Sequence, residues 1–175
     1  MNLSFSTKFK DGTSTYFCDK ILKGLRKYKY FDRLRYWLFL DILYAFDTRL
    51  ISITTHHSKI HTIREDKKDR WKAGNDIHFI INPRSKTRFQ FAPVLKCKSV
   101  QKIEILHYGN LIELIIDEST IFNIRKNHQN NKVYNYDHNV QDLAHNDGFE
   151  TVQDFFDYFN KDFKGKIIHW TDFKY

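Results

Sequence analysis

The sequence predicts an α+β fold in which a mostly antiparallel β-barrel carries flanking helices and a helical insertion near its beginning. From about residue 50 onward, short apolar segments alternate with tight turns, which favours antiparallel strands over parallel βαβ units. Before that point, over residues 16–50, apolar residues recur at helical spacing. The chain has 175 residues, the length of one ordinary domain, so we expect a single domain over 1–175.

Three segments are predicted to be helices. Residues 15–30 form the first, although Gly24 weakens it, and Asp32 is placed to cap a second helix that runs to about Thr48. Apolar residues at helical spacing are expected to form the buried face of this second helix: Phe31, Leu34, Leu38, Ile42 and Ala45. Thr151 begins the third helix, with Asp154 placed to complete a capping box.

The remaining apolar segments are predicted to be strands. The pattern indicates strands or extended segments at residues 3–6, 50–53, 59–64, 77–81, 88–91, 94–106, 111–116 and 166–173. Gly109 and Asn110 are expected to close a hairpin, and residues 82–86 form a basic turn. The polar stretch 121–142 is expected to be a surface excursion.

The charge of the chain indicates an anionic partner. Lys and Arg number 29 against 21 Asp and Glu, for a formal net charge of +8. Such an excess attracts polyanions, whether nucleic acid or an acidic membrane surface, although it also serves solubility alone. The most apolar run, residues 36–46, is too short to span a bilayer and contains Asp41, so we expect no membrane partner.

The cysteines and histidines exclude several classes of site. Cys18 and Cys97 are far apart and form no CxxC pair, which argues against a disulfide scaffold or a thiolate zinc site and fits a reducing cytoplasm. His56, His57 and His61 come without a recognised metal motif, so neither a metal nor another cofactor is predicted.

One short segment combines residues suited to chemistry. Lys59, Thr62 and Arg64 offer an ammonium, a hydroxyl and a guanidinium, which together suit a phosphate, a carboxylate or a developing oxyanion. Thr62 and Arg64 share a face of a strand, whereas Lys59 joins them only if the chain bends just after it. The alternative is a plain strand edge whose charges are solvated.

The same segment resembles a known family. The run Lys59-x-x-Thr62-Ile63-Arg64, followed by Arg70-Trp71-Lys72-x-Gly74 and Ile77, resembles the ASCH family of small PUA-like β-barrels. The stretch from Asp147 to Thr151, the later Phe-rich helix and the closing strand around Trp170 also fit that family. His57 departs from it, because the family has a glycine there.

The resemblance implies a site. Thr at position 62 is similar to the acetylcytidine amidohydrolase branch, in which the lysine activates the threonine as a nucleophile and a later acid assists. Carried over to this chain, Lys59 would be the base, Thr62 the nucleophile and Asp147 the acid, with Glu150 as its substitute. A threonine hydroxyl needs such a neighbouring amine, kept neutral by desolvation, to become nucleophilic.

Basic residues near turns are the candidate ligand-binding surface. Cations and neighbouring rings can hold phosphates and stack bases, whereas the alternative is a solvated hairpin tip beside core aromatic residues. The candidate binding residues are Arg64, Arg70, Trp71, Lys72, Arg84, Lys86 and Arg88. Trp71 has its own alternative, which is to cover one end of the barrel.

Three functions follow from these observations. The first is recognition of RNA or of a modified nucleoside or nucleotide in a pocket lined by Lys59, Thr62 and Arg64. The second is hydrolysis of an acylated nucleoside by Lys59 and Thr62. The third is protein interaction through the aromatic helical insertion.

Overall fold

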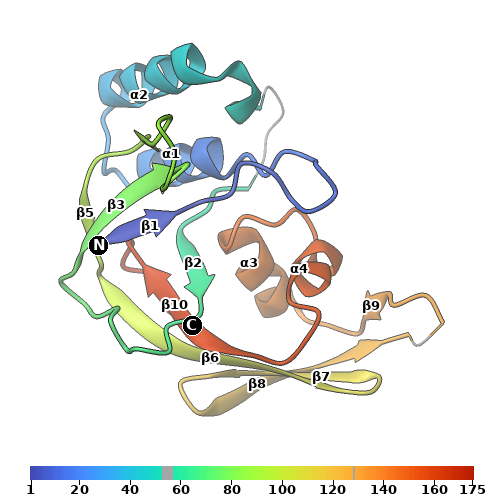
Figure 1. Ribbon diagram of the computed structural model, residues 1–175. Coiled ribbons are helices and arrows are strands. Elements are labelled where there is room, and N and C mark those ends of the chain that lie inside the picture. The colour runs from blue at the N-terminus through green and yellow to red at the C-terminus, as the bar shows by residue number, and fades with distance from the viewer. Residues whose placement is uncertain (53–56, 128) are drawn as a thin grey trace.

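A curled antiparallel sheet, which forms a half-barrel, is the centre of an α+β architecture (Figure 1). The computed structural model describes residues 1–52, 57–127 and 129–175. The six-stranded sheet has the order β2-β10-β6-β7-β8-β9, and all of its pairs are antiparallel. Its strands are β2 (His61–Arg64), β6 (Ser99–Tyr108), β7 (Leu111–Ile116), β8 (Ser119–Lys126), β9 (Val133–Tyr134) and β10 (Phe163–His169).

A smaller sheet closes part of the open side. In it, β3 (Asp76–Ile81) pairs with β1 (Asn2–Ser4), β4 (Phe89–Gln90) and β5 (Leu95–Lys96). The pairing of β1 with β3 is parallel, in contrast to the antiparallel pattern expected from the sequence. Arg64 of β2 donates from its guanidinium to the backbone oxygen of Ser4 at 2.6 Å, which ties the two sheets together.

Two hydrophobic cores lie on opposite faces of β10. Ile168 packs in a core with α1 (Phe17–Lys27), Trp170 and the inner residues of β1 and β3. Its neighbour Ile167 packs in a second core with α3 (His138–Asn146) and α4 (Val152–Tyr158). Because neighbouring residues of a strand point to opposite faces, one strand serves both cores.

Several local predictions are confirmed. The Asp32 side chain accepts a hydrogen bond from the Arg35 backbone N–H at 2.7 Å and begins α2 (Arg33–Phe46). Thr151 and Asp154 form the expected capping box at the start of α4. Gly109 and Asn110 join β6 to β7, with Tyr108 opposite Leu111. The basic turn follows β3 as expected.

Other segments differ from expectation. Residues 48–50 form a short 3-10 helix, η1 (Thr48–Leu50), instead of an extended segment, and residue 53 lies outside the described residues. The strand expected over 94–106 is divided, since the Cys97 backbone N–H bonds to the loop before β3 whereas that of Lys98 bonds to His169 of β10. The chain therefore leaves one sheet and enters the other at this point.

The stretch 121–142 is largely regular structure and not a surface excursion. It contains most of β8, all of β9 and the beginning of α3. Asp117 and Glu118 both have positive φ, the conformation of a tight two-residue hairpin turn, so the chain returns directly from β7 to β8. Ile124 and Val140 are fully buried.

The helix α2 buries a different face from the expected one. Tyr36 and Leu43 are its buried residues, while Leu34, Leu38 and Ile42 are exposed. The apolar residues of α2 itself are distributed all around the helix, so their spacing alone does not identify the side that packs. Within the described residues, no helix is both long enough and apolar enough to cross a bilayer.

Candidate functional site

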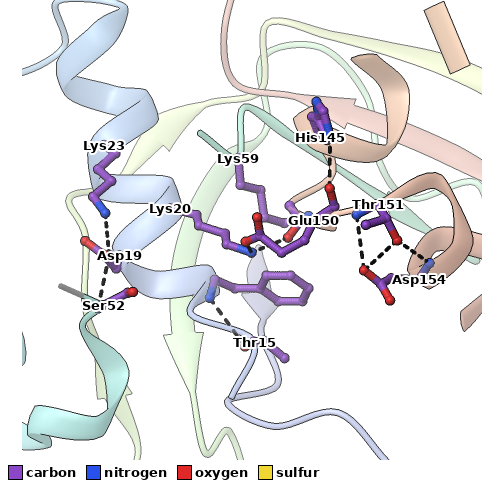
Figure 2. A network of polar contacts seen from close by, with 12 residues as sticks. Thr15, Asp19, Lys20, Lys23, Ser52, Lys59, His145, Glu150, Thr151 and Asp154 are labelled. Carbon is purple, nitrogen blue, oxygen red and sulfur yellow. Dashed lines mark hydrogen bonds and ion pairs between the residues drawn. The ribbon is translucent and has the colours of Figure 1, made fainter. Parts of the chain in front are cut away.

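Two buried lysines hold the loop that links α3 to α4. Lys20 of α1 donates to the Gly148 backbone oxygen at 2.6 Å and pairs with the Glu150 carboxylate at 2.7 Å. Lys59, just before β2, donates to the Asp147 carboxylate at 2.5 Å and also to the Asp147 backbone oxygen. Figure 2 shows both side chains pointing toward the segment around Glu150. Together they form a lysine clamp, Lys20 and Lys59, on the loop 147–150.

Two glycines make this close packing possible. Gly148 has a φ of +93°, and a Cβ there would lie 3.0 Å from both the Lys59 side chain and the Phe17 ring. Gly24 lies on α1 where a Cβ would come within 2.7 Å of the Lys59 backbone oxygen. A larger residue at Gly148 would press against the Lys59 side chain, and one at Gly24 would press against the Lys59 backbone.

Burial controls the charge of the Lys59–Asp147 pair. It lowers the pKa of Lys59 to about 8, although the Asp147 carboxylate acts in the opposite direction. It also raises the pKa of Asp147, against the favourable charge of Lys59 and the hydrogen bond from the Ile63 backbone N–H at 3.1 Å. The ammonium of Lys59 also lies over the Phe17 ring, 4.7 Å from its centre. The pair is a desolvated contact inside the protein.

Lys59 and Thr62 lie on different sides of the strand. In the register of β2 with β10, Thr62 is opposite Ile168 and Ile63 is opposite Ile167, so Thr62 faces the first core. Lys59 instead shares the side of His61 and Asp147. Within the described part of the chain, no hydrogen bond joins the Lys59 ammonium to the Thr62 hydroxyl.

The other residues of the segment have separate partners. Glu150, the expected substitute for Asp147, pairs with Lys20, whereas Lys59 pairs with Asp147 itself. The Arg64 guanidinium packs over the Phe5 ring at 5.4 Å, besides its bond to Ser4. The structure therefore pairs Lys59 with Asp147, gives Arg64 and Glu150 other direct partners, and turns Thr62 toward the first core.

Sequence reasoning gave no role to Lys20 or to a buried pair of histidines. Lys20 is buried, and it lies one turn from both Phe17 and Gly24, which was the available signal. His61 and His169 face each other across β2 and β10 with ring centres 5.3 Å apart. No local pattern reveals that pairing, because it depends on which strands are neighbours.

Both histidines are buried. His61 lies with its Nε2 atom 2.8 Å from the Tyr175 hydroxyl, which also accepts a hydrogen bond from the Asn146 side chain at 3.0 Å. Burial lowers the pKa of His169 to about 4 and that of His61 well below its usual value. Both rings are therefore neutral at pH 7.

The candidate binding residues divide between the two ends of β3. Arg70, Trp71 and Lys72 precede this strand, whereas Arg84, Lys86 and Arg88 follow it, and a strand of that length spans about 20 Å. Arg70 and Lys72 each lie 3.9 Å from an aspartate, Asp66 and Asp69. The Trp71 side chain is buried in the first core, so its ring does not present a face for stacking.

The three residues that follow β3, Arg84, Lys86 and Arg88, belong to an exposed basic turn, residues 82–88. Its backbone is held by internal hydrogen bonds, from Ser85 N–H to the Asn82 oxygen and from Arg88 N–H to the Ser85 oxygen. Arg84, Lys86 and Arg88 are exposed, and none of them forms an ion pair with another described residue. Beyond the turn, Phe89 stacks on Phe46 of α2 with ring centres 4.2 Å apart.

The basic turn lies in a stretch of unusual charge. Residues 77–103 contain no Asp or Glu but carry six cations: Arg84, Lys86, Arg88, Lys96, Lys98 and Lys102. The last three pair with Asp76, Asp172 and Glu118. The positive charge of this stretch is thus left unneutralised at the basic turn.

A cavity of about 390 Å³ opens beside Glu150, between the segment 9–14 and α4. Its polar lining is mainly acidic, with Asp11, Asp154 and Asp157 near Glu150, and Lys10 is its lysine. Such a cavity does not suit a phosphate, because the carboxylates would repel it.

The described residues hold no group of three or more His, Cys, Asp or Glu side chains that could bind a metal. Of the histidines considered from the sequence, His56 lies outside the described residues, and His57 stacks on His145 with ring centres 3.5 Å apart.

No protein-family model matches the chain, and no curated protein or solved structure is detectably similar to it.

Proposed function

We propose that this chain binds single-stranded RNA through the basic turn. The observation that carries the proposal is the set of three exposed cations, Arg84, Lys86 and Arg88, that no described acidic residue neutralises. Phosphate contacts by such cations supply most of the sequence-independent affinity for nucleic acid. The net charge of +8 would add long-range attraction.

The surroundings of the turn support a single strand as the ligand. Its internal hydrogen bonds fix the backbone, so the cations are presented without a large ordering cost on binding. The partly exposed Phe46, stacked on Phe89, offers an aromatic surface beside the cations. Cations that track a phosphate backbone beside rings that stack on bases are the usual means of binding single strands.

The test is a binding measurement at several salt concentrations. A labelled single-stranded RNA of mixed sequence is titrated with the wild type and with the variant Arg84→Ser, Lys86→Ser, Arg88→Ser. We expect the variant to bind at least about tenfold more weakly and to lose about two units of the slope of log K against log salt, since each lost phosphate contact lowers that slope by about 0.7.

The same stretch provides a matched control. Lys96→Ser, Lys98→Ser, Lys102→Ser removes equal charge from cations that already have acidic partners. This variant should keep most of the affinity. Equal losses of RNA affinity in the two variants would show that binding responds to net charge alone. A wild type that does not bind RNA would exclude the proposal.

The resemblance to the ASCH family is consistent with this function. A PUA-like barrel would place the chain among domains of RNA-modifying proteins, and the half-barrel sheet is compatible with that fold. A modified nucleoside could then be the specific part of the RNA ligand. Cys18 and Cys97 are buried free thiols, which suits the cytoplasmic location that the proposal assumes.

A second candidate function is hydrolysis of an acylated nucleoside, favoured by the pKa of about 8 at Lys59. An amine with this pKa can accept a proton near neutral pH more readily than an exposed lysine. Reaction at Thr62 would require Lys59 to leave Asp147 and cross the strand.

Thr62→Val tests this reaction, because it removes the hydroxyl and leaves the lysine clamp unchanged. If Thr62 is the nucleophile, release of acetate from acetylcytidine should disappear while the melting temperature stays close to that of the wild type. Release that persists in the variant, or that is absent from the wild type, would exclude this mechanism.

A further inference from the structure

The cavity beside Glu150 has the size of a small-molecule site. Its volume is about 390 Å³, and pockets that enclose small ligands usually measure roughly 300 to 1,000 Å³. It lies between the segment 9–14 and α4, which are neighbours in the fold (Figure 1). Each wall contributes an aromatic ring to the lining, Phe9 from the segment and Tyr158 from α4. The cavity can therefore hold a small organic molecule against ring surfaces.

Internal hydrogen bonds fix both walls of this cavity. In the segment 9–14, the Phe9 backbone N–H donates to the Thr13 backbone oxygen at 2.9 Å, which closes a tight turn. On the other wall, the capping box holds the Asp154 carboxylate against Thr151, as Figure 2 shows. A ligand therefore enters a preformed cavity, and its binding does not have to order the chain first.

The charge of the cavity is opposite to that of the whole chain. Asp11, Asp154 and Asp157 line it and form no ion pair with a described residue. One oxygen of each accepts a hydrogen bond from an uncharged neighbour: Thr13 at 2.7 Å, Thr151 at 2.8 Å and Gln153 at 2.8 Å, respectively. Within the described part of the chain, no donor reaches the second oxygen of any of the three. Because Glu150 is paired with Lys20, these three carboxylates against Lys10 leave the cavity negative in a chain of net charge +8.

A ligand that fits this cavity is cationic at both walls and apolar between them. Asp11 lies on one wall, whereas Asp154 and Asp157 lie on the other. The described residues hold no group of three or more metal-binding side chains, so these carboxylates do not converge on a single ion. The rings of Phe9 and Tyr158 attract ammonium groups and provide a surface on which methylene groups pack.

We propose that the cavity binds an aliphatic diamine or polyamine. One ammonium group lies at Asp11, a second lies at Asp154 and Asp157, and the methylene chain between them packs on Phe9 and Tyr158. Ion pairs of this kind form charge-assisted hydrogen bonds to the carboxylate oxygens that the protein leaves available. The proposal is independent of RNA binding, because it uses none of the residues of the basic turn.

Three ligands of equal chain length test the need for two charges. Putrescine, butylamine and butanediol are each titrated into the RNA-free protein in a calorimeter. We expect saturable binding of putrescine, about tenfold weaker binding of butylamine, which reaches only one wall, and no binding of butanediol. Putrescine that does not bind at millimolar concentration would overturn the proposal, and so would equal affinity for putrescine and butylamine.

The double variant Asp11→Asn, Asp157→Asn locates the site. It removes one charge from each wall, and each amide oxygen can still accept the hydrogen bond from Thr13 or Gln153. We expect the dissociation constant for putrescine to rise by about tenfold or more, with the far-UV circular dichroism unchanged. Putrescine affinity equal to that of the wild type would place the ligand elsewhere and overturn the proposal.

Two further measurements separate this site from a response to charge alone. Asp41→Asn, Asp142→Asn removes two exposed carboxylates outside the cavity and should bind putrescine like the wild type. Tyr158→Leu keeps every carboxylate but removes a ring, and should weaken binding by about threefold. An equal loss of affinity in the Asp41, Asp142 control would overturn the proposal. Calcium that binds the wild type and competes with putrescine would also overturn it, because it would identify a metal site instead.

Discussion

His61 and His169 are two basic side chains that the fold keeps uncharged. Both are fully buried, and the ring nitrogens of His169 have no hydrogen-bond partner among the described residues. A charge on the His169 ring would have to be desolvated without a hydrogen-bond partner to compensate it. Burial therefore holds the pKa of His169 at about 4, below its ordinary value of 6.5.

This shift makes stability depend on pH. Below about pH 6.5 the unfolded chain takes up a proton at His169, whereas the folded chain does so only near pH 4, so acid favours unfolding within that window. We expect His169 alone to lower the free energy of unfolding by on the order of 2 kcal/mol between pH 7 and pH 5. Urea unfolding followed by tryptophan fluorescence at the two pH values measures it.

The variant His169→Asn isolates the effect. It should lose this share of the pH dependence, and the exposed His138→Asn should keep it. If His169→Asn and the wild type lose the same free energy between pH 7 and pH 5, the folded protein must already protonate His169 in that range.

At the residue scale, the sequence did not determine the partners of the candidate site residues. Lys59 and Asp147 were both expected in the site, and the structure joins them directly. The expected bend toward Thr62 does not bring the lysine to the hydroxyl, because strand alternation keeps Lys59 on the side of His61. Which face of a short strand meets a distant loop is a property of the tertiary fold.

The helix α1 lies against the segment that precedes β2, and Gly24 is the point of closest approach. A glycine in the middle of a helix normally destabilises it by about 1 kcal/mol relative to alanine. Here a Cβ would lie 2.7 Å from the Lys59 backbone oxygen, too close for ordinary contact. The residue that weakened the helix prediction is the one that lets the helix pack.

Gly24→Ala should therefore destabilise the protein, by roughly 1–3 kcal/mol, in spite of the better helix propensity of alanine. Chemical denaturation measures the change. Lys27→Ala, on the exposed side of the same helix, should change the stability by less than about 0.5 kcal/mol. A gain in stability from Gly24→Ala would mean that α1 can move away from Lys59 at little cost.

At the element scale, locally encoded features were predictable. The Asp32 cap, the capping box of Thr151 and the hairpin at Gly109 depend on residues within a few positions of each other. The prediction of the buried face of α2 was wrong, because the sequence of a helix with apolar residues on all sides does not specify which side is buried. The division between β5 and β6 was also missed, since nothing local marks the change of sheet at Cys97.

At the scale of the whole molecule, the α+β class and the mainly antiparallel sheet were predictable from the succession of short strands and turns. The two cores on opposite faces of β10 were not, because they depend on where α1, α3 and α4 pack. The positions of the basic residues relative to one another were not predictable either. Arg70 and Arg88 are near each other in sequence, yet a strand separates them in space.

The parallel pairing of β1 with β3 has a consequence for synthesis of the protein. Leu3 and Phe5 are translated long before their neighbours in the core, such as Phe79 of β3. Until then these two apolar side chains have no native place to pack, and a long loop must close before they do. β1 can therefore join its sheet only after the whole of β3 has been translated, and we expect a nascent chain stalled before residue 81 to expose Leu3 and Phe5.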